Sequence, residues 1–166
     1  MYSSRVMLHI TRHATRLAVL LAIVLTSQAA FAQTKTKATA AKTPLTVYKT
    51  PTCGCCGKWV EHMEANGFAS TTTNLPDLTA IKAKHGVPAR LQSCHTSLVG
   101  GYVIEGHVPA ADIRRLLKER PKIVGLAAPG MPAGSPGMDV PNSPAYDVLA
   151  FDKDGNTKVF ASHPAR

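Results

Sequence analysis

Two hydrophobic periodicities alternate along the central part of the chain. Residues 45–48 and 68–73 are rich in the threonine, β-branched and aromatic residues that strands prefer. Between them, Trp59 and Met63 recur at helical spacing, and Asn66 begins an Asn-Gly pair that stops a helix. The pattern predicts a strand, a helix and a second strand in this order.

The following segments continue the alternation. Asp77 can cap a short helix. Residues 96–99 and 102–105 have strand character and flank a Gly-Gly pair, which suits a type I′ turn between antiparallel strands. Pro109 then opens a helix with apolar residues on one face, and Pro121 closes it. The pattern predicts a helix, a hairpin and a last helix.

The complete order is strand, helix, strand, helix, strand, strand, helix. This order predicts an α/β fold with a thioredoxin-like βαβαββα core, in which the first loop and the helix after it carry the chemistry. Residues 128–144 are rich in proline and glycine, so we expect a Pro/Gly/Met-rich loop without regular structure there. Residues 146–151 and 157–160 predict a C-terminal β-hairpin. Residues 45–166 are expected to form a single domain.

The N-terminus has the layout of a secretory signal peptide. Basic residues precede an apolar run over residues 17–25, and small residues follow, ending at Ala32. The run is much shorter than the roughly 20 residues that a membrane-spanning helix needs. We expect cleavage after Ala32, a periplasmic mature protein without stable membrane insertion, and a flexible Thr/Ala/Lys linker over residues 33–44.

The basic charge does not indicate a nucleic-acid partner. The formal net charge is +9, and it falls to +6 when residues 1–32 are removed with their three arginines and no acidic residue. The remaining lysines and arginines are scattered, and they do not interleave with aromatic residues along a surface. We therefore expect no nucleic-acid binding.

Four cysteines are the main candidates for chemistry. Cys53, Cys55 and Cys56 lie within four residues, and Cys94 is distant in the sequence. An exported protein normally has oxidised cysteines, so two structural disulfides are one interpretation, for example Cys53 with Cys56 and Cys55 with Cys94. Adjacent cysteines bridge each other only with strain, which limits the pairings.

Two functional interpretations compete with the structural one. Cys53 and Cys56 have C-x-x-C spacing next to a helix N-terminus, which favours thiolates, so a thiol-disulfide oxidoreductase would use Cys53 as nucleophile and Cys56 as resolver. Cys55 adds nothing to that exchange but does add a metal donor. The predicted topology brings Cys94 to the first loop, and four sulfurs suit Cu(I), with zinc as competitor.

Four further residues are candidate ligands. His95 and His107 carry imidazoles near the predicted thiol cluster, although such residues are often surface or hydrogen-bonded groups. Met131 and Met138 carry thioethers, which suit Cu(I), in a loop with little core for them to fill.

These residues and their surroundings resemble the periplasmic CopG-like proteins of bacterial copper-resistance systems, which differ from the DNA-binding repressors of that name. The resemblance covers residues 45–161. It rests on the segments 52–59, 93–96, 100–109, 130–132 and 134–138. It implies a thioredoxin-like fold, copper binding by the clustered cysteines, and a role in copper handling or copper redox chemistry.

The main hypothesis is an exported Cu(I)-binding protein for copper resistance, with metal ligands Cys53, Cys55, Cys56 and Cys94. His95, His107, Met131 and Met138 are secondary candidates, and other periplasmic copper-handling proteins are candidate partners. The alternative is a periplasmic thiol-disulfide oxidoreductase, so the sequence leaves open whether the protein is an enzyme. The third interpretation is a module stapled by disulfides.

Overall fold

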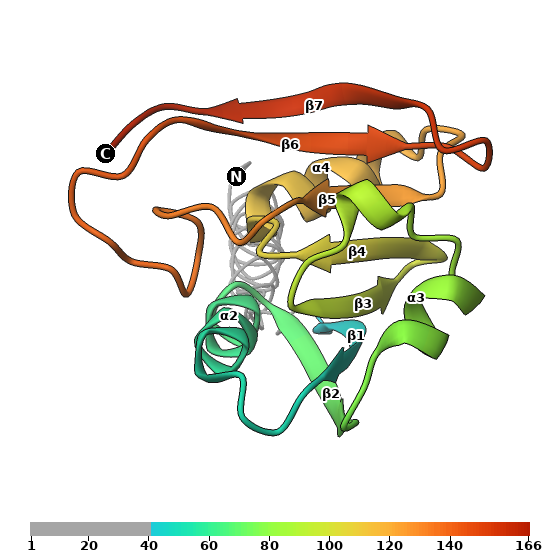
Figure 1. The fold of residues 1–166 in the computed structure, drawn as a ribbon, viewed down its shortest axis with the longest axis horizontal. Coiled ribbons are helices and arrows are strands. Elements are labelled where there is room, and N and C mark those ends of the chain that lie inside the picture. The colour runs from blue at the N-terminus through green and yellow to red at the C-terminus, as the bar shows by residue number, and fades with distance from the viewer. Residues whose placement is uncertain (1–40) are drawn as a thin grey trace, which may run out of the picture. The chain divides into compact units, whose positions relative to one another are not determined.

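A seven-stranded mixed sheet organises the residues that the computed structural model describes, 41–166 (Figure 1). The predicted signal peptide and residues 33–40 of the predicted linker lie outside this range. The strands are β1 (Thr43–Lys49), β2 (Phe68–Asn74), β3 (His95–Val99), β4 (Tyr102–Gly106), β5 (Gly125–Ala128), β6 (Tyr146–Phe151) and β7 (Thr157–His163). The helices are α2 (Gly54–Ala65), α3 (Thr79–Lys84) and α4 (Ala110–Glu119), with a 3₁₀ turn η1 (Ala89–Leu91).

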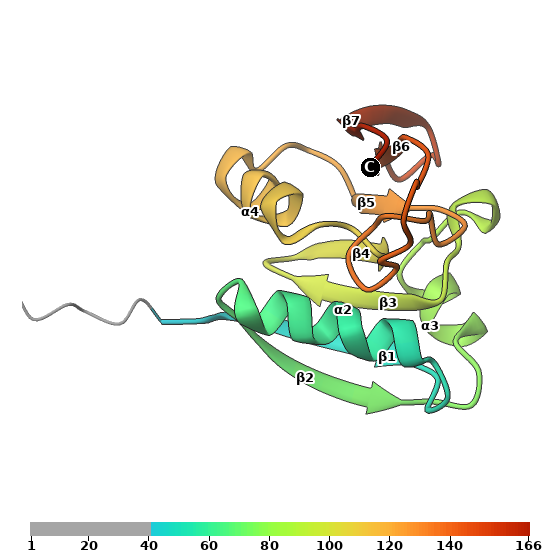
Figure 2. The same ribbon diagram turned by 90° about the vertical axis from the view of Figure 1, so that its left-hand side faces the viewer.

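The strands follow the order β2-β1-β3-β4-β5-β6-β7. The pairs β1 with β2 and β4 with β5 are parallel, and the other neighbours are antiparallel. Helix α2 makes the crossover from β1 to β2 and runs along β1 (Figure 2). Gly100 and Gly101 join β3 to β4 with φ angles of 54° and 90°, and a type I′ turn needs two such positive angles. The predicted order of elements up to α4 is present.

The two faces of the sheet pack into two separate cores. Successive strand residues point to opposite faces. Ile104 of β4 packs with Trp59 of α2 and Ile113 of α4, and all three side chains are fully buried. Val103, the preceding residue, belongs to the second core, which includes Leu91 of η1. Helices α2 and α4 therefore cover one face, and the segment around η1 covers the other.

Some boundaries differ from the sequence predictions. Strand β1 begins at Thr43, two residues inside the predicted linker. Leu78 is the N-cap of α3, and Asp77 accepts hydrogen bonds from the backbone N–H and the hydroxyl of Thr79 instead of capping directly. The predicted C-terminal hairpin is present, but β7 continues to His163.

Strand β5 was not predicted. It consists of Gly125–Ala128, all buried, and it lies between β4 and β6. A Cβ atom on Gly125 would lie within 1.9 Å of the Val103 carbonyl oxygen, so only glycine fits there. A strand of four residues buried on both faces, three of them small, shows no alternation of apolar and polar positions, which explains why the pattern did not reveal it.

Residues 129–145 contain no helix or strand, in agreement with the predicted loop over 128–144 except at Ala128, which is the last residue of β5. Within residues 41–166, no helix is both long enough and apolar enough to cross a bilayer.

Candidate metal centre

The N-terminus of α2 presents three of the cysteines. Cys53 is the N-cap residue with extended backbone, and its side chain makes no capping hydrogen bond. Cys55 and Cys56 lie in the first turn, where the partial positive charge of the helix end stabilises thiolates. Cys53 and Cys56 form a disulfide, one of the two pairings considered from the sequence, whereas Cys55 is a free thiol.

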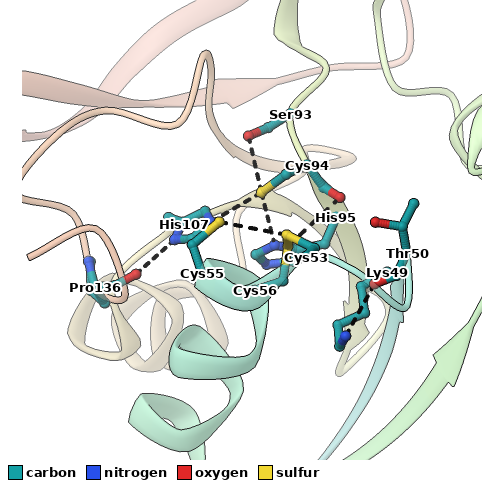
Figure 3. The surroundings of a disulfide bond; sticks show 10 residues. All are labelled: Lys49, Thr50, Cys53, Cys55, Cys56, Ser93, Cys94, His95, His107 and Pro136. Carbon is teal, nitrogen blue, oxygen red and sulfur yellow. Dashed lines mark hydrogen bonds between the residues drawn. A yellow bond between two sulfur atoms is a disulfide. The ribbon is translucent and has the colours of Figure 1, made fainter.

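Cys94 reaches the same place from the start of β3. Strand β3 is antiparallel to β1, with His95 opposite Lys49 at the end of β1 that leads into the cysteine loop. The four sulfur atoms all lie within 4.8 Å of one another, and those of Cys53 and Cys55 are 3.5 Å apart (Figure 3). The structure thus brings the distant thiol to the first three, as the topology predicted.

Two histidines complete a second group that shares Cys56 and Cys94 with the first. The Cys94 sulfur lies 3.4 Å from His95 Nδ1 and 3.0 Å from His107 Nε2. These ligand atoms and the Cys56 sulfur also lie within 4.8 Å of one another. His107 therefore comes closer to the distant thiol than His95 does.

Burial keeps this second group uncharged at neutral pH. Burial lowers the pKa of His95 well below its ordinary value, helped by repulsion from His107 and two lysines, and it also lowers the pKa of His107. Burial, together with the charge on Cys55, raises the pKa of the Cys94 thiol to about 11. At pH 7, the structure offers neutral imidazoles and a protonated Cys94 thiol.

The raised pKa gives a direct prediction for Cys94. Only the thiolate is alkylated, and at pH 9.0 a thiol of pKa 11 is about 1% ionised, whereas one of pKa 9.0 is half ionised. We expect iodoacetamide to modify Cys94 about 50-fold more slowly in the folded protein than in urea at this pH. Peptide-resolved mass spectrometry measures both rates, and equal rates would show that the thiol is not perturbed.

The orientation of His107 is set by the loop after β5. His107 Nδ1 lies 2.7 Å from the Pro136 carbonyl oxygen, which can only accept, so Nδ1 carries the proton. Nε2 is then the nitrogen with the free lone pair, and it faces Cys94. For His95, Nδ1 faces Cys94, and Nε2 is buried without a hydrogen-bond partner among the described residues.

Gly137 holds this loop against α2. With φ at +82°, a Cβ atom there would lie 2.7 Å from the Cys55 carbonyl oxygen and 2.8 Å from the Trp59 nitrogen. We expect Gly137→Ala to lower the free energy of unfolding by about 2–3 kcal/mol. Gly130→Ala is the control, because Gly130 has a φ of +71° but no atom within 4 Å of the added Cβ. Urea denaturation compares them, and equal losses would mean that contact with α2 is unimportant.

The two loop methionines differ in exposure. Met131 is 41% exposed, and Met138 is partly buried in the turn that its backbone forms with Gly134 and Ser135. Metal ligation by either thioether, and by the cysteines and histidines above, stays a prediction.

The sequence analysis missed two charged residues beside the cluster. Lys82 of α3 and Glu105 of β4 form a buried ion pair. Glu105 is one of five consecutive buried residues in β4, so a charge inside an otherwise apolar strand was the available signal.

Comparison with known proteins finds one family model and two solved structures that match this chain. A family model described as "Protein of unknown function, DUF411" matches residues 91–138. No curated protein matches the chain. Two solved structures, both of copper resistance protein CopG (form 1 and form 2), are 44% identical to it with TM-scores of 0.70. Each covers 74% of this chain, and the chain covers 98% and 99% of theirs.

The chain belongs to the CopG family of copper resistance proteins. This confirms the resemblance seen in the sequence. The match to DUF411 includes Cys94, His95, His107 and both loop methionines, but it begins after the first three cysteines. In this CopG family member, the cysteine cluster is able to bind metal, which supports a copper-related role.

Proposed function

We propose that this protein is an exported copper-binding protein that holds Cu(I) through the thiolates of Cys53, Cys55, Cys56 and Cys94 and serves copper resistance. The observation that carries the proposal is the convergence of four sulfur atoms, from two remote segments, within 4.8 Å of one another. The names of the CopG relatives support copper as the metal. The strand order from β2 to β4 and the crossover helix support a thioredoxin-like classification of the core.

The donor set fits a soft metal ion. Four sulfurs around a tetrahedral ion at about 2.3 Å lie about 3.8 Å from one another, so small side-chain rotations bring this cluster to bonding distance. Thiolates and neutral imidazoles favour Cu(I), and zinc is the competitor because it also accepts four thiolates. His95 and His107 would assist, with Met131 and Met138 as further candidates.

Copper binding would require changes in redox and protonation state. The disulfide must first be reduced by an external dithiol, which supplies two electrons and two protons, becomes a disulfide itself and leaves two thiols on the protein. The Cys94 proton must then leave, so affinity should rise with pH below about 11. The protein would either sequester Cu(I) or promote its oxidation to the less membrane-permeant Cu(II), with the released electron passing to an external acceptor such as dioxygen. Four thiolates in so small a space could bridge several ions.

Metal loading tests the proposal. The reduced protein is loaded anaerobically with Cu(I), with and without excess zinc, and native mass spectrometry counts the bound ions. We expect copper to bind and to displace zinc. A protein that keeps no copper after buffer exchange would contradict the proposal. N-terminal sequencing of the periplasmic fraction tests export and cleavage after Ala32.

The disulfide favours one second candidate, a thiol-disulfide oxidoreductase. Cys53 is partly exposed and Cys56 is fully buried, which matches an attacking and a resolving thiol at a helix N-terminus. This function predicts insulin reduction without metal that survives Cys55→Ser and Cys94→Ser. Absence of such activity in the metal-free protein would remove this candidate.

A further inference from the structure

A buried ion pair lies next to the segment that carries Cys94. Lys82 is 6% exposed and Glu105 is 0% exposed. The Lys82 ammonium contacts the Glu105 carboxylate and also donates a hydrogen bond to Thr96 Oγ1 at 3.1 Å. The proposed copper chemistry uses neither charged residue, so the pair needs another explanation.

The Glu105 carboxylate accepts hydrogen bonds from both sides of the Cys94-His95 dipeptide. The backbone N–H of Ser93 donates to Oε1 at 2.6 Å, and the hydroxyl of Thr96 donates to Oε2 at 2.7 Å. The two candidate ligands are therefore held between two anchored neighbours. His107, whose imidazole is the nearer of the two to Cys94, comes directly after Gly106, the last residue of the strand that carries Glu105.

Strand alternation places the ion pair on the face opposite the His95 side chain. The His95 ring lies 4.3 Å from the ring of Trp59, on the face that α2 covers. Thr96, the next residue, is paired in register with Glu105. Because successive side chains point to opposite faces, Thr96, Glu105 and Lys82 meet on the other side of the sheet. Their influence on Cys94 passes through the backbone.

A buried ion pair is a poor way to stabilise a fold, because the loss of solvation offsets the attraction between the charges. An ionised carboxylate nevertheless has one property that apolar residues lack. It only accepts hydrogen bonds, and it has enough lone pairs for the ammonium, the Ser93 amide and the Thr96 hydroxyl at once. Lys82 places a positive charge directly beside this carboxylate.

We propose that Lys82 and Glu105 are positioning residues that hold the Cys94-His95 dipeptide at the distance from α2 that metal capture requires. This inference rests on the proposed copper-binding function. Groups behind the ligands of a metal site commonly change its affinity by about 10–100-fold when they are removed.

Two double variants separate positioning from simple charge burial. Lys82→Met/Glu105→Gln and Lys82→Met/Glu105→Leu both remove the two charges, but only glutamine keeps an oxygen that can accept from the Ser93 amide. The exposed pair Lys153 and Asp154 gives the control, Lys153→Met/Asp154→Asn. Cu(I) affinity is measured by competition with bicinchoninate, and Ser93 amide exchange is measured by NMR on the metal-free protein.

We expect the leucine variant to bind Cu(I) about 10–100-fold more weakly and to lose the protection of the Ser93 amide. The glutamine variant should stay within about threefold of the wild type, as should the control. Wild-type affinity in the leucine variant, or equal losses in both double variants, would overturn the inference.

Thr96→Val decides the question if the leucine variant does not fold. It removes the Thr96 hydroxyl and leaves both charges in place. We expect about tenfold weaker Cu(I) binding, and unchanged binding would overturn the inference. Failure of the wild-type protein to bind Cu(I) would instead defeat the proposed function.

Discussion

Replacing Cys94 with serine is expected to weaken Cu(I) binding by more than about 100-fold. The 4.8 Å cluster would lose its only sulfur from outside the first loop, and the Cys94 sulfur also lies within 3.4 Å of a ring nitrogen of His95 and of His107. Removal of a group behind a ligand already lowers metal affinity by about 10–100-fold, so removal of a ligand itself should lower it further. Anaerobic competition with bicinchoninate measures the change on the reduced protein.

A pair of histidine variants provides the comparison for Cys94→Ser. His107→Gln should also weaken binding, though less, because a nitrogen ligand is less suited to Cu(I) than a thiolate. His85→Gln is the control, since His85 stacks on Tyr48 and belongs to neither metal-ligand group found in residues 41–166. Wild-type affinity in Cys94→Ser would contradict a shared site, provided that circular dichroism shows the variant to be folded.

The sequence pattern predicted the parts of the site that depend on topology. The Gly-Gly turn identified a hairpin, and a hairpin after a parallel crossover brings the start of β3 beside the end of β1. For this reason the proximity of Cys94 to the first loop could be predicted from the sequence, although Cys94 lies 41 positions after Cys53. The spacing of Cys53 and Cys56 likewise allowed the disulfide that the structure contains.

The remaining features depend on side-chain contacts that periodicity does not encode. Lys82 lies in a short helix whose pattern gives no sign that an ammonium is buried, and its partner lies 23 residues away. The hydrogen bond from His107 to Pro136 comes from a loop without regular structure, so no repeat in the sequence predicts its position. Both features depend on contacts between segments that are remote in the sequence.

Copper capacity is expected to depend strongly on the redox state of the protein. With the Cys53–Cys56 disulfide intact, two of the four sulfurs carry no thiolate, so only the free thiols of Cys55 and Cys94 and the two imidazoles remain. We expect the oxidised protein to bind fewer Cu(I) ions than the reduced protein and to bind them at least about 100-fold more weakly, because thiolates are the preferred ligands. Native mass spectrometry and chelator competition, with and without prior reduction, measure both quantities.

A cysteine variant separates this prediction from the oxidoreductase alternative. In Cys53→Ala/Cys56→Ala, no disulfide can form in the first loop, so copper binding should be weak and should not respond to the reductant. An oxidoreductase that does not use copper would instead lose insulin reduction in this variant, and its wild-type form would show the same copper content before and after reduction. Equal copper content in the two redox states of the wild type would therefore count against the thiolate site. If reduction raises copper binding in the wild type but not in Cys53→Ala/Cys56→Ala, the disulfide itself controls copper binding. Reduction then creates the two missing thiol donors at the N-terminus of α2.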